Sequence, residues 1–211
     1  MKTLIVGIGP ARCMTTFFTR ELEKNKKIYI PGRKEVNLLH KDQFDMNNYK
    51  KIMFSTNRDI VIDYTNNYSL SIKNVKKNIL KIKEEMDINV KYLFLYRDPV
   101  KRFISHLELL SDRSNLSYDK LEYDLIQSCM KQSIYSKMLR EIDRDLTFIY
   151  DMDKALKNIN HFSEEVSNFL EIEKHDFNIS KKIGDSKKIK LHFIEKIRQK
   201  TFIFLERNNL D

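Results

Sequence analysis

The chain has 211 residues and a formal net charge of +9, with 39 Lys and Arg against 30 Asp and Glu. Hydrophobic residues make up 41% and charged residues 33%, a balance that excludes a disordered or membrane-spanning chain. The length predicts a single domain over residues 1–211. The positive charge favours anionic partners, such as a nucleotide, a sulfated or phosphorylated substrate, or an anionic membrane that the protein contacts peripherally.

The sequence predicts a cytoplasmic protein without disulfides. No apolar run reaches the roughly eighteen residues of a transmembrane helix. Met1–Val6 enters a predicted core strand and lacks the apolar stretch and cleavage site of a signal peptide. Cys13 and Cys129 form neither a local pair nor part of a metal-ligand set. We therefore expect no disulfide framework and no metal site.

Short apolar runs alternate with amphipathic stretches along the chain. Strands are predicted at residues 4–6, 27–30, 60–63, 92–96 and 146–150. Helices are predicted at residues 14–24, 72–86, 120–142, 155–170 and 189–205, and a further one begins at residue 100. Strands that alternate with helices predict an α/β fold, a single domain with a central, mainly parallel sheet flanked by helices.

The first predicted strand leads into a candidate anion-binding loop, residues 7–16, with the sequence GIGPARCMTT. In open α/β sheets, ligands bind at such junctions, where backbone N–H groups and a helix N-terminus can face an anion. Arg12 adds a fork of cationic donors, and Thr15 and Thr16 add hydroxyl groups. The loop lacks the G-x-x-x-x-G-K-[ST] spacing of a nucleoside-triphosphate site. A purely structural turn is the alternative.

A second candidate site follows the strand predicted at residues 92–96. Arg97 lies at the strand end, Asp98 and Pro99 form a turn, and Ser105 lies on the next helix. This spacing lets Arg97 and Ser105 converge on one anion. In the alternative interpretation, Arg97 pairs with Asp98 or another neighbouring acidic residue and Ser105 is an ordinary helix residue.

Both segments resemble donor-binding motifs of sulfotransferases that use 3′-phosphoadenosine 5′-phosphosulfate (PAPS), and are nearest to those of carbohydrate and heparan-sulfate sulfotransferases. Arg12–Thr16 is similar to the 5′-phosphosulfate loop, roughly [KR]-x-G-T-T, with Met14 in place of the glycine. Arg97–Ser105 is similar to the 3′-phosphate motif. The family also places a basic, glycine-containing loop over the nucleotide, which corresponds to residues 181–188. The resemblance implies a P-loop-NTPase-like sulfotransferase fold and a donor site formed by Arg12, Cys13, Met14, Thr15, Thr16, Arg97, Ser105, Lys182, Gly184 and Lys187.

Two weaker matches lie between these motifs. Residues 33–39 resemble the segment K-E-V-H-F-F of glycan sulfotransferases, whose glutamate is the general base, so that role falls on Glu35. Asn37 stands where that segment has histidine. Residues 63–68 resemble E-K-[ST]-P-x-Y, with Tyr64 at the basic position and Asn66 at the proline. This second segment therefore contributes no cation. An exposed glutamate in a charged loop is the alternative for Glu35.

The resemblance implies transfer of a sulfuryl group from PAPS to a hydroxyl or amine, with 3′-phosphoadenosine 5′-phosphate (PAP) released and no metal required. A small-molecule or glycan acceptor is expected, and a carbohydrate or glycoconjugate is favoured. Glu35 and Arg12 would be the catalytic residues. One alternative is a small nucleotide or sugar kinase with a degenerate phosphate loop, and another is a non-catalytic protein that binds PAP or a polyanion. Nucleic-acid binding is not expected, because the basic residues are not interleaved with aromatics in a recognisable module.

Overall fold

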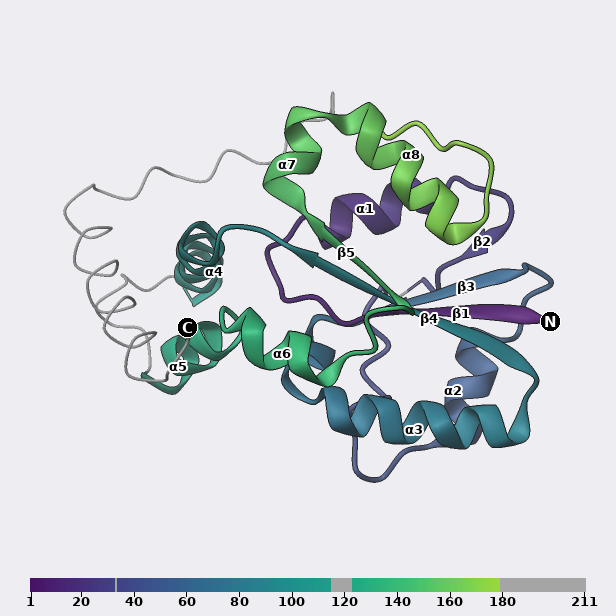
Figure 1. Ribbon diagram of the computed structural model, residues 1–211. Coiled ribbons are helices and arrows are strands. Elements are labelled where there is room, and N and C mark those ends of the chain that lie inside the picture. The colour runs from purple at the N-terminus through teal and green to yellow at the C-terminus, as the bar shows by residue number, and fades with distance from the viewer. Residues whose placement is uncertain (33, 115–122, 179–211) are drawn as a thin grey trace.

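The computed structural model describes residues 1–32, 34–114 and 123–178 around a five-stranded sheet (Figure 1). The strand order is β2-β3-β1-β4-β5, and every neighbouring pair is parallel. The strands are β1 (Lys2–Gly7), β2 (Ile28–Tyr29), β3 (Ile60–Tyr64), β4 (Ile88–Tyr96) and β5 (Thr147–Asp151). All five strands expected from the sequence are confirmed. β4 begins four residues before its expected start at residue 92.

Helices cover both faces of this sheet. They are α1 (Thr15–Leu22), α2 (Met46–Met53), the 3-10 helix η1 (Asn66–Leu70), α3 (Ile72–Glu85), α4 (Pro99–Ser114), α5 (Tyr123–Lys131), α6 (Tyr135–Glu141), α7 (Met152–Lys157) and α8 (Ile159–Leu170). Within the described ranges, none of them is both long and apolar enough to cross a membrane. The helix expected at residues 189–205 lies outside the described residues.

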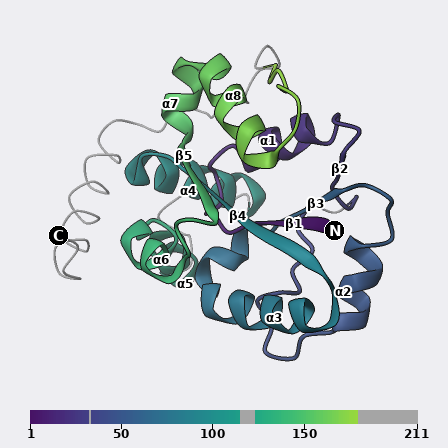
Figure 2. The same cartoon turned by 45° about the vertical axis from the view of Figure 1, so that its right-hand side comes forward.

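Alternating side chains of the strands divide the core into two layers. Ile5, Ile62 and Leu93 pack with α1, α7 and α8 on one face, while Leu4 and Val61 pack with α2, α3 and α6 on the other. Figures 1 and 2 show these two groups of helices on opposite sides of the sheet. Strands buried on both faces carry continuous apolar runs, which is why β1 and β3 were readily predicted.

One predicted helix, residues 120–142, is wrong as a continuous element, because its described part forms two helices, α5 and α6. The fully buried guanidinium of Arg102 explains the break between them. Its Nη2 donates to the carbonyl oxygen of Cys129 and to the Ser133 hydroxyl. The backbone N–H of Ser133 instead donates to the carbonyl of Met130 at 2.8 Å, which tightens the last turn and ends α5.

The helix predicted at residues 155–170 is also interrupted. α7 begins earlier, at Met152, where the side chain of Asp151 caps the helix by accepting from the N–H of Asp153. Asn158 separates α7 from α8, and its side chain accepts from the N–H of His161 at 3.2 Å. Asparagine is a favoured N-cap residue, so a new helix starts at this point. α2 was not predicted, and it too begins at a side-chain cap, Asp45.

Two glycines let the chain between β1 and α1 pass close to β3 and β4. A Cβ atom at Gly7 would lie 2.3 Å from the ring of Tyr64. A Cβ atom at Gly9 would lie 2.6 Å from the carbonyl oxygen of Leu95 and 2.6 Å from the hydroxyl of Tyr64. The start of this loop therefore packs closely against Tyr64 at the end of β3 and Leu95 near the end of β4.

We expect Gly9→Ala to lower the free energy of unfolding by about 1–3 kcal/mol, because the added methyl group meets backbone that cannot easily move. Urea unfolding followed by circular dichroism measures the loss. Gly32→Ala is the matched control, since nothing lies within 4 Å of a Cβ atom placed there. Equal stability of the two variants would contradict this close approach at Gly9.

Candidate functional site

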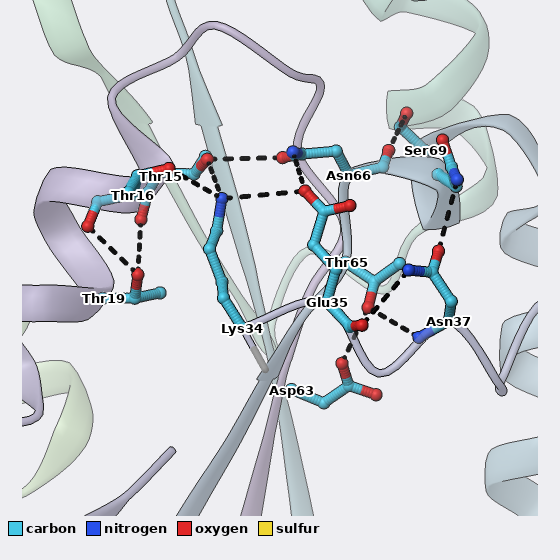
Figure 3. A network of polar contacts seen from close by, with 11 residues as sticks. Thr15, Thr16, Thr19, Lys34, Glu35, Asn37, Asp63, Thr65, Asn66 and Ser69 are labelled. Carbon is cyan, nitrogen blue, oxygen red and sulfur yellow. Dashed lines mark hydrogen bonds and ion pairs between the residues drawn. The ribbon is translucent and has the colours of Figure 1, made fainter. Parts of the chain in front are cut away.

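The predicted site residues that the structure describes lie near the carboxyl ends of β1, β3 and β4. The chain leaves β1 for α1 on one face of the sheet and leaves β3 for η1 and α3 on the other. Ligands of open α/β sheets bind at such a switch point. The β1–α1 loop, residues 8–14, and the segment of residues 34–39 border this point. Figure 3 shows the side chains that connect the first turn of α1 with this segment.

The β1–α1 loop has two non-glycine residues in the left-handed region. Arg12 has a φ of 69° and Met14 a φ of 57°. Glycine adopts this region most easily, and a residue with a side chain loses roughly 1–2 kcal/mol there. Met14 therefore adopts a backbone conformation that glycine, the residue of the resembled motif, would adopt at lower cost. The N-cap residue of α1, Met14, makes no side-chain hydrogen bond to the first turn, so it does not cap the N–H groups of that turn. Uncapped N–H groups at a helix N-terminus can bind an anion.

The two predicted anion motifs are in contact. Nε of Arg12 donates to the hydroxyl of Ser105 at 3.1 Å, although 93 residues separate them in the chain. Arg102 supports this junction, because its Nη1 donates to the carbonyl oxygen of Ala11 at 3.4 Å. The β1–α1 loop is thus fastened to α4 at the end where Ser105 lies. Cys13 is fully buried, main chain included, and burial raises the pKa of its thiol to about 12.

Arg97 is held at the end of β4 by an acidic residue that the sequence did not identify. Its Nη2 lies 3.1 Å from Oδ1 of Asp153, at the start of α7. The hydroxyl of Tyr135 donates to the Arg97 carbonyl at 2.8 Å. Nε of Arg97 is buried and has no hydrogen-bond partner in the described part of the chain. Arg97 therefore has an ion-pair partner, Asp153 and not the adjacent Asp98, and its side chain is 24% exposed.

Lys34 lies over the threonines of α1. Its Nζ donates to the hydroxyl of Thr15 at 2.7 Å and to that of Thr16 at 3.3 Å. It lies 5.6 Å from the centre of the Tyr64 ring. Burial of the ammonium lowers the pKa of Lys34 to about 8, and the nearby Glu35 carboxylate opposes part of this change. The sequence placed Lys34 beside Glu35 but gave no sign that it reaches α1.

Asn66 joins the candidate base to the β1 side of the site. The hydroxyl of Thr15 donates to Oδ1 of Asn66 at 3.3 Å, and Nδ2 of Asn66 donates to Oε1 of Glu35 at 2.5 Å (Figure 3). Nζ of Lys34 lies 3.9 Å from the same carboxylate oxygen. Glu35 is therefore connected to Thr15 of the candidate anion-binding loop through neutral Asn66 and charged Lys34. Asn66 stands where the related segment has proline, and its bridging role was missed in the sequence.

A buried carboxylate positions the segment that carries Glu35. Asp63 is fully buried, and it accepts hydrogen bonds from the hydroxyls of Thr65 at 2.9 Å, Tyr68 at 2.6 Å and Tyr49 at 3.2 Å. The Thr65 hydroxyl accepts from the N–H of Asn37 at 3.2 Å, and the Tyr68 hydroxyl accepts from the next two N–H groups of that segment. Burial raises the pKa of Asp63 to about 6, against the opposing effect of these hydroxyls. Enclosed in this way, Asp63 cannot reach an acceptor substrate.

Three residues assigned to the donor site, Lys182, Gly184 and Lys187, lie outside the described residues. Of the others, Arg12 and Ser105 meet directly, Thr15, Thr16 and Glu35 are linked through Lys34 and Asn66, and Arg97 contacts Asp153. In residues 1–32, 34–114 and 123–178, no group of three or more His, Cys, Asp and Glu is placed to hold a metal ion.

Solved sulfotransferases share this fold. The chain superposes on a sulfotransferase from Alicyclobacillus acidocaldarius with a TM-score of 0.73 at 15% identity, over 98% of this chain and 94% of that one. The sulfotransferase domain from the curacin biosynthetic pathway gives a TM-score of 0.58 at 13% identity, with 91% and 82% of the two chains covered. A mouse sulfotransferase, SULT7A1, solved as a complex with PAP, gives 0.52 at 13% identity over 95% of this chain and 64% of that one. No protein-family model and no curated protein sequence matches the chain. The predicted sulfotransferase fold is confirmed by these likenesses.

We expect the pH dependence of stability to change in Asp63→Asn. The folded pKa of Asp63 lies at about 6, above the ordinary value of 3.8, so the folded chain binds this proton more tightly. Its contribution to the free energy of unfolding is full below pH 3.8 and is lost as the pH rises through 6. Relative to Asp63→Asn, the free energy of unfolding of the parent should therefore fall by about 2–3 kcal/mol as the pH rises across this window. Urea unfolding at steps from pH 4 to pH 7 measures it, and a flat difference would show that Asp63 does not titrate in this range.

Proposed function

We propose that this protein is a sulfotransferase that moves a sulfuryl group from PAPS to a hydroxyl or amine acceptor and releases PAP. The observation that carries the proposal is the 3.1 Å hydrogen bond between Arg12 and Ser105. It joins a loop suited to a 5′-phosphosulfate with a motif suited to a 3′-phosphate, so one 3′,5′-bisphosphate nucleotide can contact both. The fold shared with sulfotransferases, one of them in complex with PAP, supports the same donor.

The donor would bind across the ends of β1 and β4. Arg12, the hydroxyl of Thr16 and the N–H group of Met14 would hold the 5′-phosphosulfate, since Met14 is partly exposed and Thr16 is exposed at the start of α1. The guanidinium of Arg97, whose side chain is 24% exposed, and the hydroxyl of Ser105 would hold the 3′-phosphate through hydrogen bonds. Residues Lys182, Gly184 and Lys187 would close over the nucleotide, as the resemblance implies.

The chemical step would be an in-line displacement at sulfur. A lone pair of the acceptor oxygen or nitrogen forms a bond to sulfur, and the bond between sulfur and the 5′-phosphate oxygen breaks with its electron pair on that oxygen. The acceptor proton passes to Glu35. Asn66 and Lys34 both contact Oε1 of Glu35, which leaves Oε2 to take the proton. Arg12 and the loop N–H groups stabilise the charge that develops on the phosphate.

The acceptor class rests on the segment of residues 33–39 and on Glu35. The side chain of Glu35 is 38% exposed, so a substrate larger than the donor can reach it from solvent. A carbohydrate or glycoconjugate is the acceptor that the K-E-V-H-F-F resemblance favours. The kinase alternative fits less well, because the cation near Thr15 comes from Lys34 outside the β1–α1 loop and not from a Walker lysine within it.

We expect PAP to bind without Mg²⁺ and to bind more tightly than ATP, because the two anion motifs suit phosphates at both the 3′ and the 5′ positions. Calorimetric titration with each nucleotide, in EDTA and in Mg²⁺, tests this. Binding that requires metal and prefers ATP would overturn the proposal in favour of a kinase. PAP binding without any turnover of PAPS would instead support the non-catalytic alternative.

We expect Glu35→Gln to lower sulfuryl transfer by about two to four orders of magnitude, the usual contribution of a positioned general base. The amide keeps the shape of the side chain and can still accept from Asn66, so PAP affinity should change little. Initial rates of PAP release with a panel of sugars, phenols and amines give the measurement. Glu84→Gln, an exposed change on α3, is the control and should behave like the parent. Turnover near the parental rate would show that Glu35 is not the base, and a large loss of PAP affinity would make it a donor-site residue.

A further inference from the structure

The ammonium of Lys34 points into the candidate 5′-phosphosulfate site. Its donors are directed at the hydroxyls of Thr15 and Thr16, 2.7 Å and 3.3 Å away, which belong to the first turn of α1 (Figure 3). These hydroxyls lie beside the open N–H groups of that turn. A group that binds between the threonines and the loop therefore comes within reach of Nζ of Lys34.

The surroundings of Lys34 leave much of its charge uncompensated. The side chain is only 19% exposed, and its carboxylate neighbour, Glu35, lies at 3.9 Å and shares the same oxygen with Asn66. The closer contacts are two neutral hydroxyls and the face of the Tyr64 ring. A charge withdrawn from water without a close counter-ion costs free energy. An anion bound at the loop would recover part of that cost.

Tyr64 occupies the position at which a cation would be expected at the end of β3, and Lys34 lies over its ring. Tyr64 ends β3, where the related E-K-[ST]-P-x-Y segment has its basic residue. Its side chain is fully buried, and it packs so closely over Gly7 that a Cβ atom there would lie 2.3 Å from the ring. The ammonium of Lys34 thus lies over the face of this ring, with Nζ 5.6 Å from the ring centre. At the end of β3, Tyr64 provides an aromatic ring, and Lys34 provides the positive charge that lies over that ring.

We propose that Lys34 is a catalytic residue whose ammonium binds the oxygen between the sulfur and the 5′-phosphate, in place of the cation missing at Tyr64. This inference rests on the proposed sulfuryl transfer. As the acceptor lone pair bonds to sulfur and the sulfur–oxygen bond breaks, the electron pair stays on the phosphate oxygen and Lys34 donates a hydrogen bond to it. Lys34 keeps its proton throughout, and the acceptor proton goes to Glu35. A hydrogen-bond donor aimed at developing charge contributes about 10²–10³-fold to the rate.

A pH dependence follows from this role. The titratable groups that face Lys34 are Glu35 in its own segment and Tyr64 at the end of β3, while Thr15 and Thr16 of α1 do not titrate. Burial raises the pKa of Tyr64 well above 10, so it stays neutral. The pKa of Lys34 lies at about 8, so the charged form is lost as the pH rises through 8. Because kcat/KM reports the free enzyme, kcat/KM for PAPS should fall above that pH.

The experiment compares Lys34→Met, Lys34→Arg and the parent chain by two readouts, PAP affinity from calorimetry and PAP release from PAPS with water as the acceptor. Lys34→Met should lower PAP release at least about hundredfold and PAP affinity about tenfold. Lys34→Arg should keep both within about tenfold, and its affinity and kcat/KM should no longer fall above pH 8, because arginine stays charged. Lys81→Met, an exposed change on α3, controls for the loss of one positive charge.

The outcomes separate this inference from the proposed function. If the parent binds PAP and Lys34→Met matches it within threefold in both readouts, the role of Lys34 is wrong and the sulfotransferase proposal stands. If the parent fails to bind PAP, both are wrong. A parental rate that rises through pH 8 would overturn the inference too, since it would make neutral Lys34 the base. The pH profile of the parent decides the matter even if Lys34→Met does not fold.

Discussion

The arrangement of the site depends on one buried carboxylate, Asp63 at the carboxyl end of β3. A carboxylate fully removed from water is tolerated only with several hydrogen-bond donors, and here three hydroxyls supply them, those of Thr65, Tyr68 and Tyr49. Tyr49 comes from α2 and Tyr68 from η1, so the need to satisfy one charge fixes two helices against the end of β3. The same hydroxyls accept from the backbone of residues 37–39, so the segment with Lys34 and Glu35 is fixed as well.

A second buried charge, that of Arg102, holds separate segments together on the other side of β1. Its guanidinium contacts the carbonyl of Ala11 in the β1–α1 loop, the carbonyl of Cys129 at the end of α5, and Ser133. Burial lowers the pKa of Arg102 from its usual value, and the surrounding acceptors offset the cost of holding the charge there. The helix that carries Ser105 is therefore locked to the loop that carries Arg12. The two ends of the candidate donor site are held at a fixed separation by a residue that need not touch the donor.

Local patterns in the sequence predicted most of the fold and part of the site. Continuous apolar runs and periodic helices gave the five strands, and the loop at residues 7–16 and the motif at 97–105 were found at the ends of β1 and β4. What the sequence missed depends on contacts between distant residues. The end of α5 follows from a guanidinium 27 residues away, and the ion pair of Arg97 joins residues 56 apart. The reach of Lys34 to Thr15 depends on the course of the chain after β2, for which periodicity carries no signal.

The departures from the related motifs are mutually consistent once the packing is known. Met14 and Asn37 both adopt left-handed backbone, with φ of 57° and 58°, so each keeps the turn that its segment requires. Asparagine enters this region more easily than most residues, and its N–H reaches the Thr65 hydroxyl from there. Tyr64 fills the space above Gly7 and supports Lys34, and Asn66, with no proline ring, links Thr15 to Glu35. Lysine at position 64, as in the E-K-[ST]-P-x-Y segment, would remove the ring beside Lys34 and place two ammonium groups side by side. These departures therefore form one interdependent arrangement, in which each substituted residue is accommodated by its neighbours.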